Sequence, residues 1–268
     1  MKQLFHITNT QTDPVMQVLA LRVGEQHASF AVTGKNSNEL AELAYCTAEE
    51  WNETELNDLF AAYPVLKNSF YEVLICYDHP QSIILPSVGS AKEEAAGILN
   101  ASALPGHQQL IISETIPGWQ LLNVFSVPRE TRDWLDLKFP ITRSWHHYSL
   151  DIKNMTPSAT GTLQVDFRKN DFTVVVMSQN KFLLAQTFGY ATPEDVIYYL
   201  LKTCRQFSLS QQDVLLQLSG LIDKQSALYK ELYQYFIHPV FRESSWKMPE
   251  EYPAHFFTGL NDLAKCAS

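Results

Sequence analysis

The chain has 268 residues, 46% of them hydrophobic and 18% charged, which indicates a globular protein with one large domain or two of ordinary size. Its formal net charge of −9 argues against a nucleic-acid binder, which needs a basic surface, and against binding to an anionic membrane surface. Four scattered cysteines without a C-x-x-C pair, and the lack of an apolar signal segment at the start, lead us to expect a cytoplasmic protein with neither nucleic acid nor membrane as a partner.

The first elements predicted along the chain are a hairpin of alternating apolar residues and a third strand, followed by a helix and a buried strand. Thr54 precedes apolar residues at helical spacing, with acidic residues in the first turn where the helix dipole favours them. The predicted ranges are strands at 18–22, 28–33 and 39–46, a helix beginning at 54, and a strand at 73–76.

The same order of elements is predicted again in the second part of the chain. Thr192 and Pro193 form a strong helix start, with proline at the first helical position. The ranges are strands at 162–167, 172–177 and 182–187, a helix from 192 to 204, a strand at 214–218 and a helix at 226–236.

Between these two copies lies a stretch with no counterpart in the second copy. We predict strands at 82–86, 108–115 and 121–127, and helices at 91–101, 129–137 and 145–152. Residues 155–161 have the composition of a linker. The domain boundary is therefore placed near residue 155, and residues 82–127 are taken as an insertion in the first domain.

The alternating residues of the two hairpins repeat at a constant offset of 142, because 163 − 21 and 172 − 30 are both 142. The residues that match in this way are Leu21, Val23, Phe30 and Val32 in the first hairpin, and Leu163, Val165, Phe172 and Val174 in the second. A repeat this long indicates a duplicated domain and not a solenoid. Three meandering strands, a helix and a strand parallel to the first are the beginning of a ribonuclease H-like half.

Two such halves in tandem resemble the actin-like ATPase superfamily of actin, sugar kinases and heat-shock chaperone ATPases. Over essentially the whole chain, the sequence is more closely similar to a family of uncharacterised bacterial proteins with that fold. The segments that carry this resemblance are 123–125 (NVF), 186–188 (QTF), 192–199 (TPEDVIYY), 218–220 (LSG) and 253–257 (PAHFF). The resemblance implies an α/β protein of two ribonuclease H-like domains, about 1–155 and 156–268, with no established activity.

In the superfamily, the first hairpin turn of each half grips the phosphates of a nucleotide, using an Asp, a Gly and a hydroxyl. Here Arg22 stands where the first Asp would be expected, and Arg168 replaces the second glycine. The resemblance implies, as positions that would contact a nucleotide, Gly24, Ser29, Asp166, Asn170, Ser219 and Gly220. It makes Asp166 the candidate for holding Mg²⁺ and Asp78 a weak candidate for positioning water.

Other motifs carry less chemistry. His146 and His147 are adjacent, so one metal ion can hardly take both, and we expect a polar-aromatic surface or an inter-domain contact there. Walker A, G-x-S-x-G and G-x-G-x-x-G patterns do not occur. The aromatic segment from Trp246 to the end is expected to pack within the chain, the alternative being a partner protein.

The function expected from the sequence is that of a nucleotide-degenerate scaffold that binds another cytoplasmic protein, without a cofactor. One alternative is an active enzyme that binds Mg·ATP between the halves, with Asp166 on the metal, Asp78 positioning water and Arg22 clamping phosphate. A second alternative is a small-molecule sensor that does not hydrolyse its ligand.

Overall fold

The structure is a computed structural model that describes residues 1–9, 16–36, 39–89, 91–102, 108–155, 160–237 and 239–267. The chain divides into two compact units: Met1–Lys153 with Leu260–Ser268 form unit 1, and Asn154–Gly259 form unit 2. The first domain expected from the sequence ended near 155, and the second ran to 268. In the structure the last residues, from Leu260 on, pack with unit 1.

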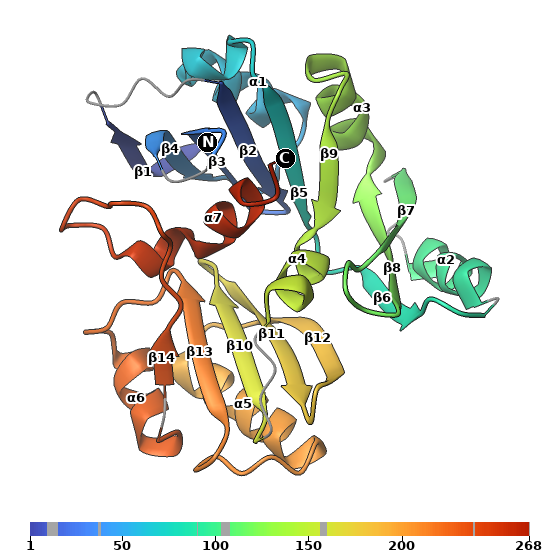
Figure 1. Ribbon diagram of the computed structural model, residues 1–268, viewed down its shortest axis with the longest axis vertical. Helices are drawn as coiled ribbons and strands as arrows, with labels where there is room; N and C mark the ends of the chain where they lie inside the picture. Colours follow the sequence, from blue (N-terminus) through green and yellow to red (C-terminus); the bar gives the residue numbers. More distant parts are fainter. Residues whose placement is uncertain are drawn as a thin grey trace. The chain divides into compact units, whose positions relative to one another are not determined.

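Unit 1 is built on a six-stranded sheet in which β2 lies beside β3 and β5 (Figure 1). The hairpin β2–β3 is antiparallel, whereas β5 runs parallel to β2, as the predicted ribonuclease H-like order requires. In sheet order the strands are β1 (Lys2–Thr8), β4 (Leu40–Thr47), β3 (His27–Gly34), β2 (Gln17–Gly24), β5 (Glu72–Asp78) and β9 (Arg143–His146).

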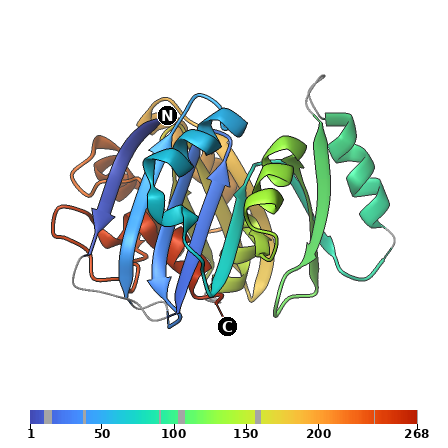
Figure 2. The same ribbon diagram turned by 90° about the horizontal axis from the view of Figure 1, so that it is seen from above.

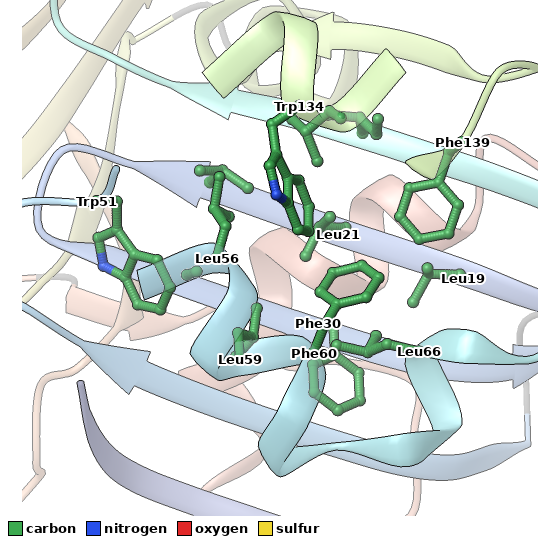
Figure 3. Packing of buried hydrophobic residues seen from close by; sticks show 14 of the residues in the cluster. Leu19, Leu21, Phe30, Trp51, Leu56, Leu59, Phe60, Leu66, Trp134 and Phe139 are labelled. Atoms are coloured by element: carbon green, nitrogen blue, oxygen red, sulfur yellow. The ribbon is translucent and has the colours of Figure 1, made fainter. Parts of the chain in front are cut away.

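Helices α1 (Glu53–Ala62) and α3 (Arg129–Lys138) pack on this sheet, as Figure 3 shows for the core of unit 1. Leu56, Leu59 and Phe60 recur on one face of α1 and are buried against strand residues such as Leu21. The indole ring of Trp134 meets Phe60 edge-on, with ring centroids 4.8 Å apart. A short 3-10 helix, η1 (Pro64–Lys67), follows α1 and adds Leu66 to the same core.

The predicted insertion forms a separate three-stranded sheet in the order β6 (Ser82–Pro86), β8 (Leu121–Pro128) and β7 (Gln109–Thr115). Helix α2 (Ala91–Ser102) lies along one face of this sheet (Figure 2). Ala95 and Leu99 of the helix pack against Val124 of the central strand.

Unit 2 repeats the arrangement of the first sheet with five strands. Again the hairpin is antiparallel, and the strand after the crossover helix is parallel to the first. In sheet order the strands are β12 (Lys181–Gly189), β11 (Asp171–Ser178), β10 (Thr162–Phe167), β13 (Leu215–Gly220) and β14 (Pro239–Phe241). The helices are α5 (Pro193–Gln206) and α6 (Ala227–Tyr235), and a separate apolar core includes Val165, Leu200 and Leu218.

The structural offset between the two hairpins differs from the offset of the apolar pattern. The strand pair closes at Val23 and Ala28 in the first hairpin and at Phe167 and Phe172 in the second, so that 167 − 23 and 172 − 28 are both 144. A shift of two residues returns every strand side chain to the same face, so alternation alone cannot separate 142 from 144. The offset of 144 makes Arg22 the counterpart of Asp166, and Gly24 the counterpart of Arg168.

Some elements of the structure were not expected. Strand β1 precedes the first strand predicted from the sequence, at 18–22. The helix expected at 145–152 is preceded by β9, and α4 (His147–Asn154) begins only at His147. The 3-10 helix η2 (Ala254–Phe257) and helix α7 (Thr258–Ala264) lie near the end of the chain. Most of the expected linker, residues 156–159, lies outside the described residues.

The prediction that the aromatic C-terminal segment packs within the chain is confirmed. Trp246 and Phe257 are 3% and 1% exposed. Nε2 of His255 lies 2.7 Å from the carbonyl oxygen of Ile222, and its ring stacks on Phe241. In the part of the chain that the structure describes, no helix is long and apolar enough to span a membrane.

Candidate functional site

The feature that sets the candidate site apart in unit 1 is a carboxylate buried at the end of β5. The side chain of Asp78 is 1% exposed. It receives a hydrogen bond of 2.7 Å from Nε of Arg22, and Nη2 of Arg22 is also 2.7 Å from the same oxygen, Oδ2. Because β2 and β5 are parallel neighbours with Gly24 opposite Asp78, these two strands bring Arg22 within reach of the carboxylate.

Two histidines complete the surroundings of Asp78. Nε2 of His27 lies 2.9 Å from Oδ2, without the alignment of a hydrogen bond, and Nδ1 of His147 lies 3.3 Å from Oδ1. His147 is also 3.9 Å from Asp151, one turn along α4. Both oxygens of Asp78 are therefore in contact with basic groups of unit 1.

Gly24 is explained by the packing of this cluster. A Cβ atom at this position would lie 2.4 Å from Cε1 of the His27 ring and 2.9 Å from the carbonyl oxygen of Asp78. Only a glycine leaves room for the imidazole and the end of β5 at such distances. Ser29, the other candidate in this hairpin, is buried in β3 opposite Arg22.

The pair His146–His147 is not at a surface, so that part of the prediction was wrong. The two side chains are buried in unit 1, with His146 fully inaccessible to solvent. Nε2 of His146 lies 2.8 Å from the carbonyl oxygen of His79. The reason is that β9, which was not expected, pairs with β5 and carries the two histidines to the end of that strand.

In unit 2 the equivalent turn is organised by a buried arginine. Arg168 is 5% exposed, and its Nε donates to the carboxylate of Asp171. Its Nη2 donates to Oγ1 of Thr173 at 2.7 Å. Nη1 lies 3.6 Å from Oδ2 of Asp166, which places a cation beside the residue considered for Mg²⁺.

The remaining candidates of unit 2 lie around this arginine network or on the adjoining strand end. Oγ of Ser219 donates to Oδ1 of Asp166 at 2.9 Å, because Ser219 and Asp166 are paired across the parallel strands β13 and β10. Asn170 is exposed in the turn, and its carbonyl oxygen accepts from the backbone N–H of Tyr190. The phenol of Tyr190 donates to the carbonyl oxygen of Arg168. Its pKa is raised, mainly because the phenol is buried.

Gly220 is required by the backbone of its own unit. Its φ is +77°, and a Cβ atom would lie 2.1 Å from the carbonyl oxygen of Phe167. The close approach of β13 to the end of β10 therefore accounts for the glycine without a ligand.

The sequence reasoning named Arg22, Asp78 and Asp166 but missed that they are members of buried charge clusters. His27, His147 and Asp151 were not connected with Asp78. A signal was present in the chain, because an arginine within a strand of otherwise apolar residues needs a buried partner. The spacing of His147 and Asp151, four residues apart, also matches one helix face. Within the described residues, no group of three or more histidine, cysteine or acidic side chains has the geometry to hold a metal ion.

Comparison with solved structures shows the fold. A protein of unknown function with an actin-like ATPase fold from Bacteroides thetaiotaomicron matches with a TM-score of 0.73 and 18% identity, over 94% of this chain and 96% of that one. A protein from a PilM–PilN type IV pilus biogenesis complex matches with a TM-score of 0.57 and 13% identity, over 93% and 98% of the two chains. The actin-like ATPase fold expected from the sequence is thereby confirmed.

A search of curated proteins finds no match. A family profile, in contrast, matches residues 8–238, which is most of the chain. The chain belongs to the family described as "Protein of unknown function (DUF3822)".

Proposed function

We propose that this protein is a nucleotide-degenerate scaffold, which uses the actin-like ATPase fold to bind another protein and not to hydrolyse ATP. The observation that carries the proposal is that the arginines of both hairpin regions are paired with carboxylates of the same unit. Arg22 is bound to Asp78, and Arg168 to Asp171 and, more distantly, to Asp166.

These residues do not fit the magnesium nucleotide of the superfamily. Mg²⁺ takes oxygen ligands at about 2.0–2.1 Å in a nearly octahedral shell. Asp166 has Ser219 on one oxygen and the Arg168 guanidinium near the other, so its negative charge is already partly balanced. A phosphate would likewise compete with the buried Asp78 and the partly exposed Asp171 for two arginines that are themselves buried.

The two glycines of the candidate set support the same interpretation. In each case the close approach of chain atoms accounts for the glycine: the ring of His27 at Gly24 and the carbonyl of Phe167 at Gly220. A protein-binding role also has a parallel in the fold, since one of the similar structures comes from a PilM–PilN complex. The partner of this chain is accordingly proposed to be a protein.

A stability measurement tests the nucleotide part of the proposal. Ligand that binds the native state alone, at a concentration a hundredfold above its Kd, raises the free energy of unfolding by about 2.7 kcal/mol. We expect that millimolar Mg·ATP leaves the urea unfolding midpoint of the wild type and of Asp166→Ala unchanged against a control with the same concentration of MgCl₂ and sodium sulfate. A rise in the wild-type midpoint that Asp166→Ala abolishes would overturn the proposal.

A further inference from the structure

A cavity of about 440 Å³ lies wholly within unit 1, between the first sheet and the inserted one. One wall is formed by the turn after β2 and the loop from β4 to α1, and the other by the insertion and the start of α3. The volume is within the range of about 300–1,000 Å³ found for ligand sites. It is separate from the buried network of Asp78, although it includes the next residue, His79.

The charged groups in the described lining of the cavity are carboxylates. Four glutamates line it, and its described lining residues include no lysine and no arginine. The four are Glu25, Glu49, Glu50 and Glu130. Glu25 accepts from the Gln81 amide, and Glu130 accepts from the backbone N–H of Glu53. The side chains of Glu49 and Glu50 are exposed and form no hydrogen bond or ion pair within the described part of the chain.

Two buried rings in the wall of the cavity have nitrogen atoms without a hydrogen-bond partner among the described residues. Trp51 and His79 are each 4% exposed. Nε1 of Trp51 and Nε2 of His79 are buried and have no hydrogen-bond partner among the described residues. Buried polar atoms are nearly always satisfied, and one that is not calls for a ligand or water. Burial lowers the pKa of His79 to about 4, so its imidazole is neutral at pH 7 and offers one donor and one acceptor.

The charge of the wall and the donor of Trp51 together define the chemistry of the occupant. Carboxylates favour a cation, and a guanidinium can bind two of them with paired, parallel hydrogen bonds. The indole N–H needs an acceptor, which a polyamine or a free guanidinium ion does not carry. A peptide with an arginine side chain provides both the cation and the backbone carbonyl.

We propose that this cavity binds an arginine side chain and the adjoining backbone of a peptide segment of the partner protein. The guanidinium lies among Glu49, Glu50 and the neighbouring glutamates, and a peptide carbonyl accepts from Trp51. The inference rests on the proposed role as a protein-interaction scaffold and gives that role a site.

The test is a titration of protein labelled with ¹⁵N in the tryptophan indoles, followed by NMR. The probe is the peptide acetyl-Ala-Ala-Arg-Ala-Ala-amide, and Trp51→Phe assigns the Trp51 signal. We expect a saturable shift of that signal, and binding at least about tenfold weaker for the same peptide with citrulline, which keeps the shape and loses the charge. No shift, or an equal response to citrulline or to spermidine, would overturn the proposal.

The matched variants are Glu49→Gln/Glu50→Gln and Glu250→Gln/Glu251→Gln, which remove the same charge from exposed positions inside and outside the cavity. We expect the first to weaken binding about tenfold and the second to leave it unchanged. If both double variants weaken binding equally, the net charge of the protein explains the effect, and the proposal is overturned. A Trp51 shift that appears on concentrating the protein without peptide would assign the cavity to a second copy of the chain, and would also overturn it.

The two proposals fail in distinguishable ways. Saturable Mg·ATP binding would overturn the proposed function, whether or not the peptide binds. If neither the peptide nor Mg·ATP binds, the proposed scaffold function stands and the proposed peptide site is overturned.

Discussion

The carboxylate of Asp78 is predicted to be a structural group on which the first unit depends. Its side chain is 1% exposed and that of Arg22 is 11% exposed, so the guanidinium is left in a poorly solvated place when the carboxylate is removed. Breaking a buried pair by removing one partner costs about 3–5 kcal/mol. Asp78→Asn should therefore lower the folding equilibrium constant by roughly a hundredfold to several thousandfold.

Urea unfolding followed by tryptophan fluorescence measures this loss of stability in unit 1. Of the five tryptophans, all except Trp246 belong to unit 1. With a slope of about 2 kcal/mol per molar urea, the midpoint should fall by about 1.5–2.5 M. The control is Asp136→Asn, which breaks an exposed pair with Arg132 on one turn of α3 and should cost less than about 0.5 kcal/mol.

A double variant separates the energy of the Arg22–Asp78 pair from the contacts that each residue makes with its other neighbours. Arg22→Met/Asp78→Asn removes both charges, so it should be less destabilised than the sum of the two single variants by about 1–3 kcal/mol. A midpoint for Asp78→Asn that equals or exceeds that of the wild type would contradict a structural role for this carboxylate. The carboxylate would then be retained at a cost to stability, as expected of a catalytic group.

Two further predictions concern backbone and pH. Gly220→Ala should lower the free energy of unfolding by about 3 kcal/mol or more, because the new Cβ atom adds a clash with Phe167 to the strain of a positive φ. Gly118→Ala should lower it by only about 1–2 kcal/mol, because its φ is also positive but its surroundings are open. Equal losses of stability in thermal unfolding followed by circular dichroism would contradict this difference. Burial raises the pKa of Glu114 to about 7 from 4.5, and a raised folded-state pKa means stability that is present below pH 4.5 and lost as the pH rises through 7. Glu114→Gln keeps the acceptor for the His146 N–H, so it should be more stable than the wild type by on the order of 2 kcal/mol at pH 8 and equal to it at pH 4; a gain independent of pH would refute the assignment.

The parts of the fold that the sequence revealed are those in which apolar periodicity is strong. The two hairpins, the crossover helices and the parallel strands were all predicted, and so was the insertion with its three strands and helix. Strand β9 was missed because its four residues are too short for a period to show, and β1 because it is an edge strand with polar residues on both faces. The offset of the repeat was two residues wrong because alternation returns to the same face at that step.

The candidate site was less predictable because it depends on which strand ends meet. Arg22 and Asp78 are 56 residues apart, and only the parallel pairing of β2 and β5 places them together. His147 reached the same point through β9, which had not been expected. In contrast, the sequence itself shows an arginine at position 168 in place of the expected glycine. The hydrogen bonds of this arginine to Asp171 and Thr173 follow from local geometry, because all three residues lie in or beside the same turn.

A calorimetric titration of the purified protein with Mg·ATP into the millimolar range, repeated with Asp166→Ala, tests whether the nucleotide site has been lost. We expect no saturable heat for either protein, because the arginines of both hairpin regions are paired with carboxylates of their own unit. Saturable binding by the wild type that is weakened in Asp166→Ala would contradict this expectation and establish a nucleotide site.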